Sequence, residues 1–354
     1  MDFTAKVTSI TQDTILPKVF DNILSDNWAG FRFISNGSKW SGETLHRPVK
    51  LVKSTLGGSF SGLDTHSTST VESRRTMSYK LKAYEIPVAI AGLDRLVNAT
   101  EAQVIDLVKA EMESTAQDAM DDIGDMFYLD GEGNGGKDFN GLDNLNDDGT
   151  TSTNVGGLSR TDWPSLEGTR TDSGGVMTLT KLGTLYVNVS GGSASRQKPT
   201  SIVSDETVWN LYESLLSPTV SANYAMNGYP VVTRRSRGAI AAGELKGGMG
   251  FTSLIYRGVP WIADEKSTAE TVWYLNENYL NWYGMKDPEM TSVNFGDTHE
   301  GTYSESPTNN TGLQFNGMIK PTNQYGEIGH IYLFGNLTTF QPRRFGRLED
   351  ITSA

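Results

Sequence analysis

The chain has 354 residues, a formal net charge of −12, 38 glycines and no cysteine. This length suffices for two domains or one elaborated domain, and 37% hydrophobic residues can build a core. The lack of cysteine excludes disulfides, thiolate chemistry and cysteine-based metal sites. The negative charge argues against gripping nucleic acid through its phosphates as the main role. No signal-peptide pattern or stretch of ~20 apolar residues is present, so we expect a soluble intracellular product.

The segment 36–92 predicts a hairpin arm that leaves its own domain. Leu45–Val52 and Ser78–Ile90 read as strands, and 13 of the 22 residues of 54–75 between them are Ser, Thr or Gly. A loop of this length is uncommon inside a compact domain. An isolated two-stranded hairpin is only marginally stable in water, so the arm needs a partner surface. Before it, Ile15–Leu24 forms a short helical pattern.

The arm is also basic, with seven cationic side chains against Asp64 and Glu72, a net charge of +5. The seven cations are Arg47, Lys50, Lys53, Arg74, Arg75, Lys80 and Lys82. From charge alone, a solvated surface hairpin is the simpler interpretation.

Residues 98–129 predict one long amphipathic helix, called the spine helix below. Thr100 and Gln103 have the spacing of a capping box. Apolar residues then recur at spacings of three and four, which gives a single stripe. The stripe consists of Val104, Val108, Met112, Ala116, Ala119, Ile123 and Phe127. About thirty helical residues span roughly 45 Å, and so narrow a stripe suits a helix laid across a sheet.

The opposite side of the spine helix is acidic, with Lys109 as its only cation. Its carboxylates are Glu101, Asp106, Glu111, Glu113, Asp118, Asp121, Asp122 and Asp125. Because they are dispersed along an exposed face, solvation or a charged contact is favoured over acid–base catalysis.

The rest of the chain predicts an irregular connection, an α/β lobe and a return to strands. The connection is 130–175, with Trp163 as its anchor in a core, and the lobe is 176–289. The predicted helices are Met177–Val189 and a helix capped by Asp205 that runs to Leu216, and the predicted strands are Thr200–Val203, Leu254–Ala263, Val272–Leu275, Leu313–Ile319 and His330–Phe334. Residues 224–249, with Arg234, Arg235 and Arg237, predict an exposed loop, and the end of the chain is basic, with Arg343, Arg344 and Arg347.

No motif supports an active site. Gly131–Asp138 departs from a phosphate-binding loop, because Asp138 stands where Ser or Thr should hold Mg²⁺ and the segment follows a helix. Asn144–Gly149 imitates the start of a calcium loop, but Val155 stands where the bidentate Glu belongs. The four histidines lack metal-ligand spacing, and no GxSxG is present. We predict no catalytic residue, no cofactor and no metal, and therefore no enzyme.

Three short sequence motifs accompany this order of elements. They are Phe139-Asn-Gly-Leu142, Gly156-Gly-Leu-Ser-Arg160 with Trp163, and Tyr325–Leu337. In the order of its elements and in these motifs, nearly the whole chain resembles the major capsid proteins of tailed phages, whose Hong Kong 97-like fold is shared with encapsulin nanocompartments.

The resemblance implies an α+β fold with four parts. These are an N-terminal arm at 1–42, an extended loop at 43–92, a peripheral domain at 93–165 and 290–340 that carries the spine helix 98–129, and an axial α/β domain at 166–289, with the membership of 341–354 left open.

The resemblance also implies a structural subunit that self-assembles as hexamers and pentamers into an icosahedral shell around double-stranded DNA. Such a subunit is part of the virion and is assembled in the host cytoplasm. It encloses DNA without sequence-specific binding, and it has no membrane partner. A portal is implied, and because the spine helix begins near residue 98, we expect a separate scaffolding protein unless this chain is already a processed product. One alternative is an encapsulin-type compartment. Another is a β-rich, tail-associated carbohydrate binder, which leaves the long helix and the arm unexplained.

Opposite charges on the arm and the spine helix suggest a contact between subunits. We hypothesise that the seven arm cations named above meet the acidic face of a neighbour. The acidic partners are Glu111, Asp118, Asp121, Asp122 and Asp125.

Overall fold

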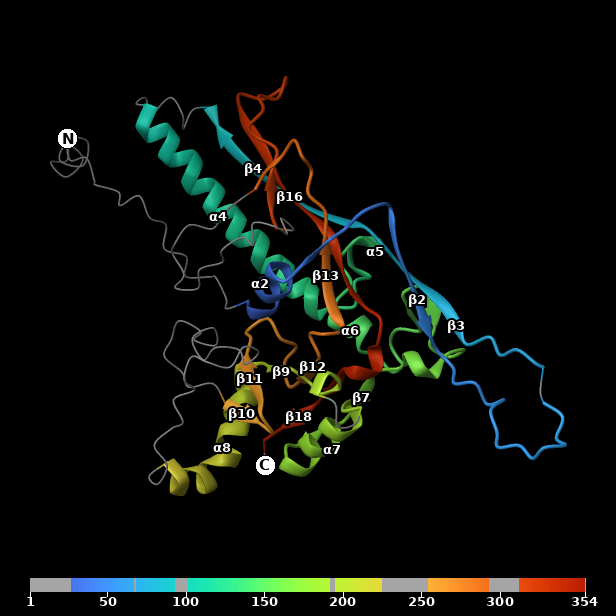
Figure 1. The fold of residues 1–354 in the computed structure, drawn as a ribbon. Coiled ribbons are helices and arrows are strands. Elements are labelled where there is room, and N and C mark those ends of the chain that lie inside the picture. Colours follow the sequence, from blue (N-terminus) through green and yellow to red (C-terminus); the bar gives the residue numbers. More distant parts are fainter. Residues whose placement is uncertain are drawn as a thin grey trace, which may run out of the picture.

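The computed structural model describes residues 27–66, 68–92, 101–191, 195–224, 254–292 and 312–353. These residues form two packed lobes, and an arm projects away from both (Figure 1). The helical pattern Ile15–Leu24, the capping box at Thr100 and the loop 225–249 lie outside the described residues. Within the described ranges, no helix has both the length and the apolar character needed to cross a membrane.

The first lobe is a sheet built on one long strand, β16 (Gly326–Thr339). β4 (Lys82–Ala91) pairs antiparallel with one edge of β16, while β13 (Leu280–Gly284) and β15 (Gln314–Phe315) follow one another along the other edge. The outer strands of this sheet are β1 (Ser38–Lys39) and β14 (Thr291–Ser292). The predicted strands His330–Phe334 and Leu313–Ile319 therefore correspond to the middle of a longer strand and to a shorter one.

The spine helix is α4 (Glu101–Tyr128), and it lies across β4 and β16 (Figure 1). Four residues of the predicted stripe are fully buried: Ala116, Ala119, Ile123 and Phe127. A short helix, α2 (Trp28–Ser35), packs against α4 and was not predicted. One apolar stripe is enough because the sheet covers only one side of the long helix.

The predicted strand Ser78–Ile90 is wrong, because this segment forms two strands. β3 (Arg74–Lys80) pairs with β2 (Thr44–Lys50) in the arm, and β4 begins at Lys82 with β16 as its partner. Burial falls on odd positions up to Leu81 and on even positions from Lys82. This change of phase moves the buried side chains to the other face of the strand as the chain passes from the arm to the sheet.

The second lobe is a sheet in the order β10-β11-β9-β12-β17-β7. The strands are β10 (Leu254–Tyr256), β11 (Val259–Ala263), β9 (Ser201–Ser204), β12 (Val272–Leu275), β17 (Gly346–Leu348) and β7 (Thr169–Thr171). It packs with α7 (Leu179–Val189) and α8 (Glu206–Tyr224), where Asp205 caps α8 as predicted by accepting from the Val208 amide.

The single strand predicted at Leu254–Ala263 is also wrong. Arg257 and Gly258 both have positive φ, 50° and 82°, and form the tight turn between β10 and β11. Two consecutive residues of positive φ match the right-handed twist of a hairpin. The C-terminal segment joins the second lobe through β17 and through β18 (Ile351–Thr352), which pairs with β8 (Gly175–Val176).

The connection between the lobes is irregular, as predicted, but Trp163 is only partly buried. The connection is anchored in the core by buried apolar residues that include Phe139, Leu142, Leu145 and Leu166. Its short elements are α5 (Gly133–Gly136), α6 (Leu142–Leu145), β5 (Asn154–Val155), β6 (Leu158–Ser159) and a 3-10 turn at Pro164–Leu166; two further 3-10 turns are Ser195–Gln197 and Pro342–Arg344.

Candidate functional site

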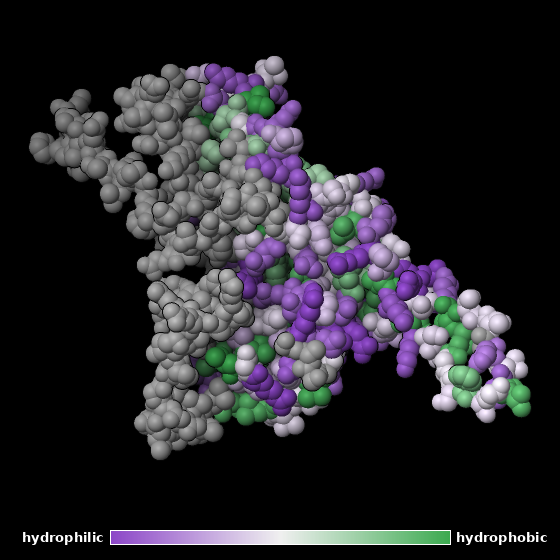
Figure 2. Space-filling view, viewed as in Figure 1, coloured by the Kyte–Doolittle hydropathy of each residue, from purple (hydrophilic) through white to green (hydrophobic). Residues whose placement is uncertain are grey.

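The base of the arm is packed, whereas its tip is not. Met77 and Tyr79 of β3 are buried, the Tyr79 hydroxyl donates to the Thr339 carbonyl at 2.6 Å, and the Ser78 amide donates to Gly156. Beyond Leu51 no strand forms up to Arg74 among the described residues. Phe60 and Leu63 are 69% and 101% exposed, and hydrophobic surface gathers at the end of the arm (Figure 2).

Four of the predicted arm cations are exposed to solvent and make up the outward-facing charge of the arm considered below. These are Lys50, Lys53, Arg74 and Lys80. Lys50 and Arg74 face each other across the β2–β3 pair. Such adjacent like charges repel, so a nearby anionic surface would relieve them.

The other three predicted cations make contacts inside their own chain. Arg47 lies over the ring of Phe340 at 4.5 Å, and Arg75 pairs with Glu72 at 2.9 Å. The Lys82 amine, half-buried on β4, donates to the carbonyls of Gly131 and Asp138. Burial lowers the pKa of Lys82, and nearby carboxylates offset part of this effect. Lys82 therefore holds the turn after α4 and is not a surface cation of the arm.

The acidic residues of α4 are partly used by the chain itself. The Lys266 amine lies 2.7 Å from Asp121 Oδ2 and 3.2 Å from Asp125 Oδ1. The Tyr84 hydroxyl donates to Asp122 at 2.7 Å. Burial raises the pKa of Tyr84 most, and the contact with Asp122 raises it further. Glu111, Asp118, Asp122 and Asp125 remain exposed. Against these carboxylates Lys266 supplies one positive charge, so the face stays negative.

The arm and α4, which carries the acidic residues, extend in different directions from the body of the molecule (Figure 1). Lys266 was missed by the sequence analysis. The signal for it was the pair Asp121 and Asp125, one helical turn apart, which can share a single cation. The residue that supplies the cation is distant in sequence and unmarked.

The loop that imitates a calcium site is filled by an internal cation. The Arg160 guanidinium is fully buried and donates to four backbone carbonyls. They belong to Asn144 (2.5 Å), Ser152 (2.6 Å), Asn154 (3.2 Å) and Leu166 (3.3 Å). The guanidinium thus satisfies four backbone carbonyls in and around this loop. In the described part of the chain, no cluster of three or more His, Asp or Glu could hold a metal.

A second buried ionic cluster joins this loop to the second sheet. Asp147 is fully buried, and its Oδ2 accepts from the amides of Gly149, Thr151 and Ser152. Its Oδ1 lies 3.0 Å from Arg347 and 3.4 Å from Arg170. Arg347 also contacts Asp143 and Glu349. Arg347, predicted as part of a basic tail, is thus a core residue.

The glycine-rich segment Gly131–Asp138 is a turn that follows α4. Gly131, Asn134, Gly135 and Gly136 all have positive φ. It follows the end of α4, and α5 within it has only four residues, with non-helical backbone angles at Asn134 and Gly135, so it does not present the strand–loop–helix geometry of a phosphate-binding loop.

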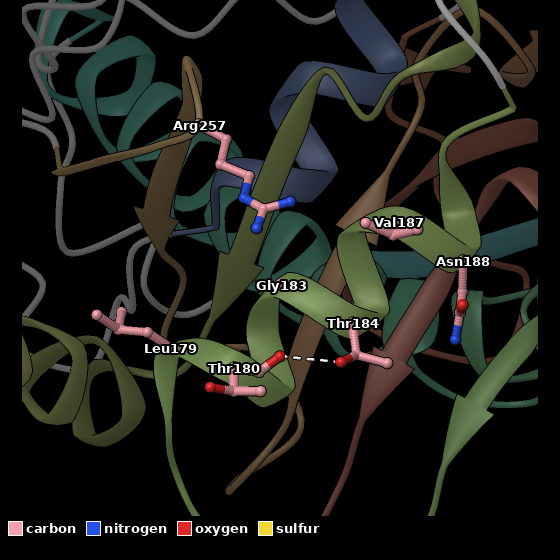
Figure 3. A pocket seen from close by; sticks show the side chains of 7 residues that line it. All are labelled: Leu179, Thr180, Gly183, Thr184, Val187, Asn188 and Arg257. Carbon is pink, nitrogen blue, oxygen red and sulfur yellow. Dashed lines mark hydrogen bonds between the residues drawn. The ribbon is translucent and has the colours of Figure 1, made fainter.

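A hollow of about 520 Å³ lies along α7 (Figure 3). Its lining is Leu179, Thr180, Gly183, Thr184, Val187, Asn188 and Arg257. Arg257 is the only ionisable side chain in this lining, and its guanidinium lies over Tyr186 and Tyr256 at 5.2 and 5.5 Å. No acid–base pair or nucleophile faces the hollow, so it gives no basis for assigning a reaction.

Comparisons with known proteins define the fold. No family model matches the chain, and no curated protein matches it in sequence. Among solved structures, the cyanophage A-1(L) capsid asymmetric unit is similar with a TM-score of 0.69 and 12% identity, and 99% of each chain is covered. The capsid of the Myoviridae phage XM1 is similar with a TM-score of 0.53 and 12% identity over 98% of each chain.

The holo-SrpI encapsulin complex of Synechococcus elongatus is also similar, with a TM-score of 0.55 and 12% identity over 99% of this chain and 96% of that one. At these identities the likeness shows the fold alone. It confirms the predicted α+β class and the predicted resemblance: the chain has the Hong Kong 97-like fold of tailed-phage major capsid proteins, which the encapsulin shell shares.

Proposed function

We propose that this protein is a structural subunit of a closed shell, and that it assembles as hexamers and pentamers into an icosahedral capsid around double-stranded DNA. The observation that carries the proposal is the arm. Its tip exposes Phe60 and Leu63 at the end of a segment without strands. Large exposed apolar side chains on a projecting segment mark a binding surface. The full-length likeness to capsid chains supports another copy as the partner.

The direct test is the size and content of purified particles. We expect size-exclusion chromatography and negative-stain microscopy to show closed megadalton shells. Nuclease-protected double-stranded DNA inside them would support a capsid, whereas a protein cargo would favour the encapsulin-type compartment. A stable monomer or trimer would contradict shell formation. The carbohydrate-binding alternative gains nothing, since the long helix and the arm that it leaves unexplained are both present.

We further propose that the protein is part of the virion and that its partners are a scaffolding protein and a portal. These proposals rest on the likeness to phage capsids. Co-purification of precursor shells with a second viral protein that is absent from mature particles would support the scaffold. Shells of normal size from the chain expressed alone would contradict it.

The contact between subunits is proposed to be electrostatic at the end of the β2–β3 pair, next to the tip of the arm. The exposed cations of one copy, centred on Lys50 and Arg74, would meet the acidic face of α4 in a neighbour. Complementary charge steers association and fixes register. Because exposed charges are screened over roughly 10 Å at 0.1 M salt, assembly should weaken as salt rises.

A double reversal, Lys50→Glu with Arg74→Glu, tests this contact. We expect the particle yield to fall and the salt dependence to invert, because raising salt then screens a repulsion. The matched control is Lys39→Glu with Lys320→Glu, which reverses two exposed lysines outside the arm. If the arm variant gave the yield and salt profile of the wild type, the charged contact would be wrong. Lys82 is unsuitable for this test because it is bound inside its own chain.

A further inference from the structure

The loop that follows β11, 264–271, touches the spine helix directly. Asp264 is fully buried, and its Oδ2 accepts from the Tyr128 hydroxyl at 2.7 Å and from the Ala29 amide at 2.9 Å. Its Oδ1 accepts from the Lys266 amide at 3.0 Å. Burial and Asp264 raise the pKa of Tyr128, so this phenol stays a proton donor. One carboxylate thus ties α2, α4 and the loop together.

Lys266 adds a second point of attachment two residues later. Its amine bridges Asp121 and Asp125, which lie one turn apart on α4. The Lys266 side chain is 12% exposed, whereas that of Asp125 is 54% exposed. Burial disfavours the charged amine, but the two carboxylates outweigh it and raise the pKa of Lys266. The bridge is therefore charged at neutral pH, and it is open to solvent on one side.

The two ends of this bridge belong to different lobes. The loop is continuous with the second sheet, because the Asp264 amide donates to the Ser204 carbonyl at the end of β9, and β12 follows directly. The spine helix packs on the first sheet through its buried apolar stripe, and the same core includes Val203, Trp273 and Leu275 of the second sheet. Moving one lobe relative to the other would therefore break the contacts of Lys266 or of Asp264.

We propose that Lys266 and its two aspartates form a clasp that sets the angle between the spine helix and the second lobe, and thereby the curvature of the shell. This inference rests on the proposed shell function. In a closed assembly of identical copies, interfaces are repeated around every symmetry axis. Each copy offers surfaces of both lobes to its neighbours, so a change in the angle between the lobes rotates every interface and changes the diameter at which the shell closes.

Two variants each remove one member of the bridge, with opposite effects on net charge. Lys266→Met removes the cation and makes the chain one unit more negative, whereas Asp125→Asn removes a carboxylate and makes it one unit less negative. If the bridge itself sets the angle, both should give mixed diameters by electron cryo-microscopy where the wild type gives one. Both should also speed hydrogen exchange in 264–271. Lys266→Arg, which keeps the charge, should retain the wild-type diameter.

The matched control is Lys320→Met, which removes an exposed lysine that pairs with Glu327 at 3.7 Å within the first lobe. It should leave the diameter unchanged. A single wild-type diameter in both bridge variants would overturn the inference while leaving the shell function intact. Opposite changes in diameter would also overturn it, because they would follow net charge. A Lys266→Met protein that folds but forms no particles would place Lys266 in a contact between copies, and this outcome would also overturn the inference. If Lys266→Met does not fold, the particle diameter of Asp125→Asn decides whether the bridge sets the angle. Absence of shells from the wild type would instead defeat the proposed function.

Discussion

At the scale of single residues, the charged side chains in the interior are the main surprise. Arg160 and Arg347 are almost completely buried, although a loop and a basic tail were predicted around them. Burying a charge is costly unless it is paired and hydrogen-bonded. Arg160 meets four carbonyls, and Arg347 meets carboxylates, so both costs are offset. Local sequence does not reveal such partners, because Asp147 and Arg347 are 200 residues apart.

We predict that Arg347→Met destabilises the protein by about 1–3 kcal/mol, since it removes buried hydrogen bonds while Arg170 and three amides still compensate Asp147. The carboxylate left behind is chiefly that of Asp147. Equilibrium unfolding in denaturant measures this change. Arg75→Met is the control: its pair with Glu72 is exposed and should contribute less than about 1 kcal/mol. Equal midpoints for Arg347→Met and the wild type would show that the network does not stabilise the fold.

At the scale of elements, the spine helix shows how a neighbour selects a residue. Gly124 is a glycine inside α4, where alanine would be favoured by about 1 kcal/mol. A Cβ at this position would lie 2.3 Å from Asn27 Nδ2. Asn27 is buried, donates to the Met120 carbonyl and accepts from the Gly30 amide, so it caps α2 against α4. The glycine therefore allows the approach of α2.

Gly124→Ala should accordingly destabilise the protein despite the gain in helix propensity. Losing the buried bonds of Asn27 costs about 1–3 kcal/mol for each unsatisfied group, which exceeds the gain of about 1 kcal/mol. Thermal unfolding would show a lower midpoint. Gly183→Ala in α7 is the matched control, because its Cβ meets chiefly the end of the long Arg257 side chain. A stabilised Gly124→Ala protein would mean that Asn27 does not cap α2 as described.

Ala116→Pro tests the continuity of the same helix. Ala116 is fully buried in the middle of α4, and proline inside a helix costs about 3 kcal/mol or more. We expect the helix to break and shells to be lost, as judged by particle yield. Gln117→Ala, at the next position, should assemble normally. A normal yield from the proline variant would mean that assembly does not need an unbroken spine.

At the scale of the whole molecule, folding and the proposed assembly depend on different parts of the chain. One core joins the first sheet, the spine helix and one face of the second sheet, and the other lies between the second sheet and its helices. The arm contributes to the first core through buried Met77 and Tyr79 and through partly buried Leu45, Val49 and Leu51. The tip of the arm adds apolar surface that stays exposed to water, so this surface does not stabilise the folded monomer. Stability and assembly should therefore be separable by mutation.

Replacing residues 52–72 with Asn-Gly tests this separation. The register Lys50↔Arg74, with the Leu51 amide bonded to the Ser73 carbonyl, leaves room for a two-residue hairpin turn. We expect the unassembled chain to lose no stability, because a shorter loop costs less closure entropy, while shells are lost. Persisting shells would show that the arm tip is not the contact between copies.

Much of the architecture could be predicted from the chain alone. The period of apolar residues in 98–129 specified the spine helix, since an amphipathic stripe is a local property. The Ser- and Thr-rich tip showed that part of the arm would lack a core, and the order of elements indicated the fold. The short helix α2 and the hairpin turn at Arg257 were missed, because packing against α4 and a two-residue change of φ leave little trace in composition.

The sequence by itself therefore determined the long helix, most of the extended segments and where charge accumulates, because these follow from the periodicity and chemistry of neighbouring residues. Only the tertiary structure decided which charges remain at the surface. It assigned Lys82 to a turn, Lys266 to two aspartates of the spine helix and Arg347 to a buried carboxylate. The physical reason is that a side chain's partner depends on contacts between residues far apart along the chain, and those contacts exist only once the two lobes have packed.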